Sequence, residues 1–221
     1  MVKNAVNIPA IEPELLKEMQ PYLTLNEKLG SFAAQLAEGN VKRAVIEYSG
    51  EVTKYDLKIL TIAATKGMLV QAVGDGVNYV NAELLAKERG IEVVQKTTDV
   101  KSDFPNLISV TVETDKDKRK VYGILSVNKE VRIVKIDNFE MEIVPEKHMI
   151  VYKNMDKPGI IGRVGTILGE KNVNIASFDV GRYKEETVAM GVLTVDSDIP
   201  ADVAESIKNV ADVIEIRSIT I

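Results

Sequence analysis

The residues whose types and spacing could do chemistry lie between positions 154 and 175, in NMDKPGIIGRVGTILGEKNVNI. Three glycines, Gly159, Gly162 and Gly165, follow a segment that predicts a strand. A phosphate-binding loop would need GxxxxGK(S/T), and a dinucleotide fold would need GxGxxG within a parallel βαβ unit. The segment has neither pattern, so it does not predict a nucleotide site.

The start of the helix predicted at these glycines could bind a smaller ligand. Asp156 and Pro158 are typical of a first turn, so we expect Asp156 near the N-cap and free backbone N–H groups at Gly159, Ile160 and Ile161. Such a terminus favours a carboxylate or phosphate by about 0.3 to 2 kcal/mol. An amino acid fits better than a phosphate, because its ammonium group could bind Asp156. In the alternative interpretation, Asp156 merely caps the helix and the glycines merely pack.

The composition of the 221 residues excludes other kinds of site. There is no cysteine, which excludes disulfides, thiol nucleophiles and cysteine-ligated metals. The single histidine, His148, has no second histidine for a metal or catalytic site, so a solvated or hydrogen-bonded role is expected. A net charge of −5 with scattered basic residues does not favour nucleic acid, and no apolar run suits a membrane span. We expect a cytoplasmic protein without a signal peptide.

Two α+β domains are expected to position the chemical residues. Residues 1–22 are predicted to be a linker. The first long helix is expected to begin near Leu23, after a shorter helix or turn from Pro13 to Gln20, because Pro13 and Pro21 interrupt the pattern. Residues 23–145 are predicted to form an α+β domain with an antiparallel sheet. In this domain a strand precedes a helix with Thr53 as N-cap and Gly67 as its end, and further strands run from 107 to 144.

Residues 146–221 predict a ferredoxin-like βαββαβ domain. Strands are expected at 148–154, 173–182, 187–195 and 213–221, and helices at 159–171 and 200–209. The strands at 173–182 and 213–221 are candidates for the sheet edges. An exposed apolar edge favours pairing with a second chain, so dimerisation is expected.

Within this βαββαβ pattern, residues 156–161 (DKPGII) and 172–175 (NVNI) resemble the signature of the ACT domain, a small-molecule-sensing module. Upstream, TIAATKGML and VNYVNAELLAKERGI resemble the intervening, or allosteric substrate-binding, domain of long-form D-3-phosphoglycerate dehydrogenase. NAVNIP resembles the end of that enzyme's catalytic region. The resemblance covers essentially the whole chain and implies a regulatory part of a longer enzyme. No cofactor is expected in this chain, and NAD would bind in the catalytic region.

The resemblance implies that L-serine binds between two ACT domains and inhibits the enzyme, in a homodimer or a homotetramer. The residues implied at this site are Asn154, Asp156, Pro158, Gly159, Ile160, Ile161, Asn174 and Ile175. Asn174 would come from the second chain. Asn154 departs from the histidine or tyrosine of other family members.

The resemblance also implies a site for an anionic or phosphorylated small molecule in the intervening domain. The candidates are Lys66, Asn81, Arg89, Arg132 and Lys135. The alternative interpretation is that these are solvated surface residues.

Two other functions compete with the dehydrogenase. The small (beta) chain of an iron–sulfur L-serine dehydratase resembles the same pair of domains, although NAVNIPAIEPE favours a segment leaving a dehydrogenase domain. A stand-alone enzyme would need a nucleophile, histidine or metal cluster, and no catalytic residue is predicted.

Overall fold

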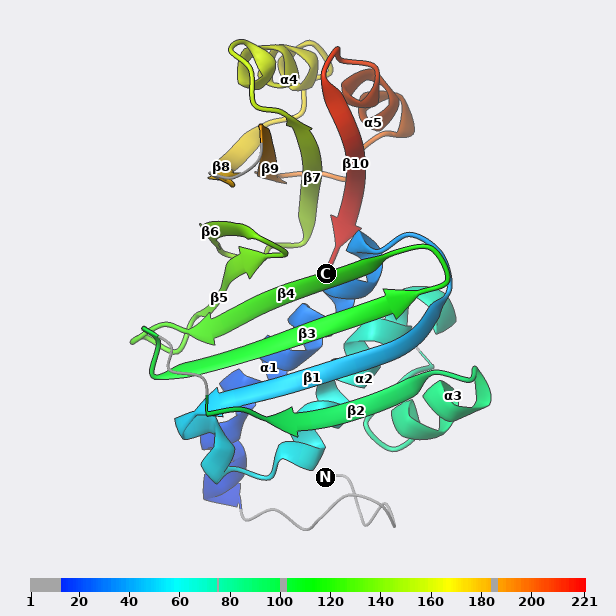
Figure 1. Ribbon diagram of the computed structural model, residues 1–221, viewed down its shortest axis with the longest axis vertical. Helices are drawn as coiled ribbons and strands as arrows, with labels where there is room; N and C mark the ends of the chain where they lie inside the picture. The colour runs from blue at the N-terminus through cyan, green and yellow to red at the C-terminus, as the bar shows by residue number, and fades with distance from the viewer. Residues whose placement is uncertain (1–12, 75, 100–102, 184–186) are drawn as a thin grey trace. The chain divides into compact units, whose positions relative to one another are not determined.

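The structure is a computed structural model that describes residues 13–74, 76–99, 103–183 and 187–221 (Figure 1). The chain divides into two compact units, Met1–Ile133 and Val134–Ile221. The first twelve residues of the predicted linker lie outside the described residues. Among the helices that the structure describes, none is both long and apolar enough to cross a membrane.

The first unit begins with one continuous helix, α1 (Pro13–Leu36), which contains Pro21. The expectation of a helix that begins only near Leu23 is therefore wrong. An internal proline costs about 3 kcal/mol. Met19 and Tyr22, on either side of Pro21, are buried with Leu29, and each large buried side chain contributes about 1.5 to 3 kcal/mol, which offsets the proline.

Helix α2 (Leu57–Val73) differs from the prediction at both ends. Its N-cap is Asp56, whose carboxylate accepts from the Lys58 N–H, whereas Thr53 lies in the preceding 3₁₀ helix η1 (Glu51–Lys54). Gly67 lies inside α2, which ends at Gly74. Gly67 is needed for another reason, because an added Cβ would lie 2.8 Å from the Glu27 carbonyl carbon of α1.

The sheet beside these helices has the strand order β2-β1-β3-β4-β5-β6. The strands are β1 (Val41–Gly50), β2 (Glu92–Thr97), β3 (Asn106–Thr114), β4 (Lys118–Leu125), β5 (Val131–Ile136) and β6 (Phe139–Ile143). β3 is antiparallel to β1 and β4, as predicted, whereas β2 is parallel to β1. That connection passes through α2 and α3 (Ala82–Glu88), and Figure 1 shows α1 and α2 covering one face of the β1–β4 strands.

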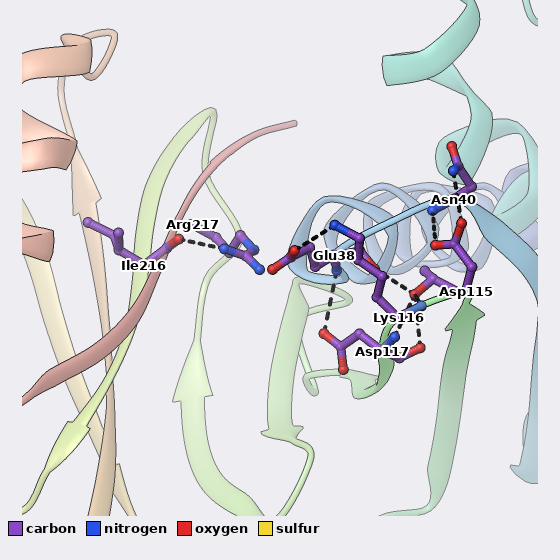
Figure 2. Close-up of polar contacts among 8 residues, drawn as sticks. Glu38, Asn40, Asp115, Lys116, Asp117, Ile216 and Arg217 are labelled. Carbon is purple, nitrogen blue, oxygen red and sulfur yellow. Dashed lines mark hydrogen bonds and ion pairs between the residues drawn. The ribbon is translucent and has the colours of Figure 1, made fainter.

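The turn after α1 is bound to the β3–β4 hairpin (Figure 2). The Asn40 backbone and side-chain amides donate to the two carboxylate oxygens of Asp115, at 2.8 and 3.0 Å. Lys116 Nζ lies 3.0 Å from Glu38 Oε1. These contacts join segments about 75 residues apart in sequence and hold the β3–β4 hairpin against the end of α1.

The second unit has the predicted ferredoxin-like order of elements. They are β7 (His148–Met155), α4 (Ile160–Glu170), β8 (Ile175–Arg182), β9 (Val188–Val195), α5 (Ala201–Lys208) and β10 (Val213–Thr220). The sheet order β10-β7-β9-β8 is antiparallel throughout and places β10 and β8 at the edges, as predicted. The α+β fold class is therefore confirmed.

Helices α4 and α5 pack on one face of this sheet. Ile150 and Tyr152 of β7 lie in a buried cluster with Val164 and Leu168 of α4 and Val203 of α5. Ile150 and Tyr152 are two residues apart on β7, and Val164 and Leu168 are four residues apart on α4, which are the spacings expected for a strand and a helix that share one core.

Part of the opposite face is occupied by β6, which belongs to the same unit. An added Cβ at Gly181 of β8 would lie 2.5 Å from the Met141 methyl carbon of β6, and Lys153 Nζ lies 5.7 Å from the centroid of the Phe139 ring. His148 begins β7, is buried, and has Nδ1 3.1 Å from Asp198 Oδ1.

Candidate functional site

The loop between β7 and α4, together with the first turn of α4, contains most of the predicted ligand-binding residues. The N-cap of α4 is Gly159, which has a φ of 93° and no side chain that could cap the helix. Asp156 lies three residues earlier, so the expectation that it might cap the helix is wrong. The first N–H groups of α4, at Ile160 and Ile161, have no intrahelical acceptors. The Ile161 side chain is 54% exposed, whereas Ile160 is buried.

Asp156 instead forms an ion pair with Arg182. Its Oδ2 accepts from Arg182 Nε at 2.6 Å and lies 2.5 Å from Nη2. The sheet explains this contact, because Arg182 ends β8 beside Ala189 of β9, and Val188 of β9 lies beside Met155 of β7. The sequence prediction did not include Arg182. Its only signal was a charged residue at the end of a strand expected at the sheet edge.

The backbone on either side of Asp156 is held independently of that ion pair. The Asp156 N–H donates to the Thr187 carbonyl at 2.8 Å, and the Met155 N–H donates to the Asp212 carbonyl at 2.9 Å. Lys157 Nζ lies 2.6 Å from Asp212 Oδ1. The loop is therefore fixed to the segments before β9 and β10, with the exposed Pro158 and Gly159 leading into α4.

A shallow hollow of about 530 Å³ lies beside the start of α4. It is lined by Gly159, Gly162, Arg163, Thr166, Ile167 and Val210. A Cβ added at Gly159, Gly162 or Gly165 would meet nothing within 4 Å. Within the described part of one chain, these glycines therefore pack against no neighbouring element, and the helix surface stays accessible.

Asn154 lies deeper than the loop. It is 6% exposed, and its Nδ2 donates to the Met155 carbonyl at 2.7 Å. Its backbone is paired with both Ala189 and Val213. In this structure Asn154 braces the end of β7, and its side-chain amide points toward that strand end.

Asn174 and Ile175 lie at the other end of β8. Asn174 is exposed, and its Nδ2 donates to Asp196 Oδ2 at 2.6 Å, which leaves its Oδ1 as the acceptor it can offer a ligand. Asp196 was also missing from the predicted set. Eight residues separate Asn174 from Arg182, so at about 3.3 Å per residue the two ends lie roughly 25 Å apart. One chain does not bring Asn174 to Asp156.

The residues predicted to bind an anion in the intervening domain have different partners in the structure. Lys66 Nζ pairs with Glu27 at 2.7 Å and lies 5.0 Å from the centroid of the Tyr79 ring. The Tyr79 hydroxyl donates to the same carboxylate, and burial raises its pKa. Lys66 is thus neutralised by a carboxylate from α1.

The other residues predicted to bind an anion also have different surroundings. The side chain of Asn81 accepts from the Asn78 N–H and donates to the Gly76 carbonyl, which closes the turn before α3. Arg89 is exposed at the end of α3. Arg132 pairs with Glu130 at 2.7 Å, and Lys135 follows it on β5. The geometry therefore adds no support to an anion site made of these five residues.

Two family models match the chain. The D-3-phosphoglycerate dehydrogenase intervening domain matches residues 18–137, and the ACT domain matches residues 148–212. The first of them alone covers more than half of the chain. This protein belongs to the D-3-phosphoglycerate dehydrogenase family.

Individual relatives support the same assignment. D-3-phosphoglycerate dehydrogenase of Methanocaldococcus jannaschii is 36% identical over 221 residues, which are 100% of this chain and 42% of the relative. The Synechocystis enzyme is 36% identical over 96% of the chain and 38% of its own length. That of Bacillus subtilis is 33% identical over 99% of the chain and 42% of its own length.

The chain thus spans about two fifths of these dehydrogenases, in their C-terminal part. It comprises an intervening domain followed by an ACT domain, as the sequence resemblance implied. The names of the relatives favour the dehydrogenase over the dehydratase interpretation. No group of three or more His, Cys, Asp or Glu side chains suited to a metal ion occurs among the described residues.

Proposed function

We propose that this chain is the regulatory region of a D-3-phosphoglycerate dehydrogenase and binds L-serine between the ACT domains of two copies. The domain pair and the relatives support the regulatory role. Asp156 pairs with Arg182 at one end of the edge strand β8, and Asn174 lies at the other end, and this separation is the observation that carries the two-chain site.

A two-fold axis between two copies of the chain would bring these two residues together. A small amino acid cannot touch two groups roughly 25 Å apart on one strand. If two copies of β8 pair antiparallel about a two-fold axis, the start of each strand lies beside the end of the other. Asn174 of one copy then lies near Asp156 of its partner. Two equivalent sites form, and each needs both chains.

The chemistry of each site matches an amino acid. Asp156 and the acceptor Oδ1 of Asn174 suit an ammonium group, and the uncapped N–H groups of Ile160 and Ile161 suit a carboxylate. A ligand that bridges two chains shifts the population toward the dimer arrangement that makes both sets of contacts. Bound serine would inhibit by this coupling to the catalytic region, where NAD binds.

A mixing experiment tests the two-chain site. Asp156→Ala and Asn174→Ala should each abolish the heat of L-serine binding and its thermal stabilisation, whereas D-serine should stabilise the wild-type chain much less. When the two variants are unfolded, mixed and refolded, a random mixture of symmetric dimers should recover about a quarter of the wild-type sites. The control Asn209→Ala removes an exposed asparagine at the C-cap of α5 in the same unit, and this variant should bind normally.

The outcomes separate the alternatives. Recovery on mixing supports a site shared by two chains. If both single variants lose binding and mixing restores none, both residues act within one chain and the proposed geometry is wrong. Unchanged binding in either variant would remove that residue from the site, and absence of any serine response in the wild-type chain would refute serine as the ligand.

A further inference from the structure

The Asp156 carboxylate is already paired with the guanidinium group of Arg182 in this structure. Arg182 Nε and Nη2 converge on Asp156 Oδ2 at 2.6 and 2.5 Å. The carboxylate that the proposed function assigns to the ligand's ammonium group is therefore neutralised before any ligand arrives.

We propose that Arg182 sets the affinity and selectivity of the amino-acid site by competing with the ligand's ammonium group for Asp156. This inference rests on the proposed function and adds a residue to it. Arg182 is a positioning residue in this scheme, since it holds Asp156 in the ligand-free protein and withdraws when the ammonium group binds.

The surroundings of the pair allow such an exchange. The Arg182 side chain is 72% exposed and that of Asp156 is 31% exposed, so the guanidinium group can move into water without leaving a buried charge. The loop keeps its backbone bond from Asp156 to Thr187 and the ion pair of Lys157 with Asp212. Release of Arg182 therefore costs one exposed ion pair and leaves the loop in place.

The competition acts only on ligands with a free ammonium group. A hydroxy acid such as 3-hydroxypropionate has a carboxylate and a hydroxyl but nothing to replace the guanidinium group on Asp156. An amino acid supplies three N–H donors to the same carboxylate. Arg182 therefore raises the concentration at which an amino acid binds, and it leaves the affinity for an amine-free ligand unchanged.

Arg182→Gln tests the inference, because glutamine keeps a polar side chain at the strand end without the charge. We expect it to bind L-serine about two- to fivefold more tightly, the range that an exposed ion pair covers. Lys208→Gln is the control, since it removes an exposed positive charge from α5 of the same unit. It should not tighten binding. The double variant Arg182→Gln with Asp156→Asn should bind as poorly as Asp156→Asn alone.

A measurement without ligand keeps the two proposals apart. In the ligand-free protein the NMR resonance of the Arg182 Nε–H group should shift in Asp156→Asn, and L-serine should shift it in the same direction. If Asp156→Asn leaves that resonance unchanged, the competition is wrong even if serine binds. If Arg182→Gln binds serine equally or more weakly while the wild-type chain binds it, Arg182 does not compete and the proposed function stands. If no variant binds serine, the proposed function fails and this inference fails with it.

Discussion

Replacement of Gly67 with alanine tests how closely α1 and α2 approach each other. A Cβ at Gly67 would lie 2.8 Å from the carbonyl carbon of Glu27, and one at Gly30 would lie 2.9 Å from that of Ala64. Each helix therefore places a glycine against the backbone of the other. Backbone atoms of a packed helix cannot move aside as a flexible side chain can, so the added methyl group must push the helices apart.

Two opposing effects determine how much Gly67→Ala changes the stability of the first unit. Alanine in a helix interior is favoured over glycine by about 1 kcal/mol. Overpacking of a filled core costs about 1 to 3 kcal/mol, and occasionally more. Because the contact here is with backbone on both helices, we expect the upper part of that range. Gly67→Ala should therefore destabilise the first unit by about 2 kcal/mol net.

Gly165→Ala is the matched control, since Gly165 also lies inside a helix but a Cβ there would meet nothing within 4 Å. It should gain about 0.5 to 1 kcal/mol from helix propensity alone. Differential scanning calorimetry of the whole chain should show a melting temperature lowered by about 5 to 10 °C for the unit with Gly67. A Gly67→Ala variant that is as stable as, or more stable than, the wild-type chain would refute the close approach of α1 and α2.

Two further predictions use carboxylates with shifted pKa values. Burial, with a further contribution from Glu142, raises the pKa of Asp179, so its charged form destabilises the fold. Asp179→Asn should melt a few degrees higher than wild type at pH 7. Calorimetry should show that this difference in melting temperature disappears below about pH 4, because the Asp179 carboxyl is then protonated in both the folded and the unfolded state. The side-chain and backbone amides of Asn40 lower the pKa of Asp115, so its stabilising effect exists above about pH 4 and disappears as the pH falls through the folded-state value. Asp115→Ala should lower the melting temperature at pH 7, and equal melting of variant and wild type there would contradict the role of this contact.

The elements of the second unit could be predicted because local patterns determine them. Ile150 and Tyr152 of β7 lie two residues apart in the core shared with α4, and Val164 and Leu168 are four residues apart on one face of α4. The errors in the first unit have a tertiary cause. Pro21 and Gly67 are normally signs that a helix ends, but burial on α1 outweighs the proline, and the contact with Glu27 explains the glycine.

The partners of the candidate site could not be read from local spacing. Arg182 lies 26 residues from Asp156, and only the pairing of β7 with β9 and of β9 with β8 brings them together. Asn174 and Asp196 are likewise 22 residues apart. The motif pointed to Asp156 and Asn174. Their partners, Arg182 and Asp196, are brought to them by strand register, which depends on the whole sheet.

These charges also bear on the choice between an amino acid and a phosphate. Asp156 is balanced by Arg182 and Lys157 by Asp212, while Asp196 adds a negative charge beside Asn174. The cations of these two ion pairs are already bound to carboxylates. They therefore could not offset the charge of a doubly negative phosphate at the helix terminus. A zwitterion brings one positive group for the carboxylates and one negative group for the N–H groups of α4, and it adds no net charge. The loop is therefore suited to a ligand that is neutral overall but carries both charges, which is the ionic state of serine at neutral pH.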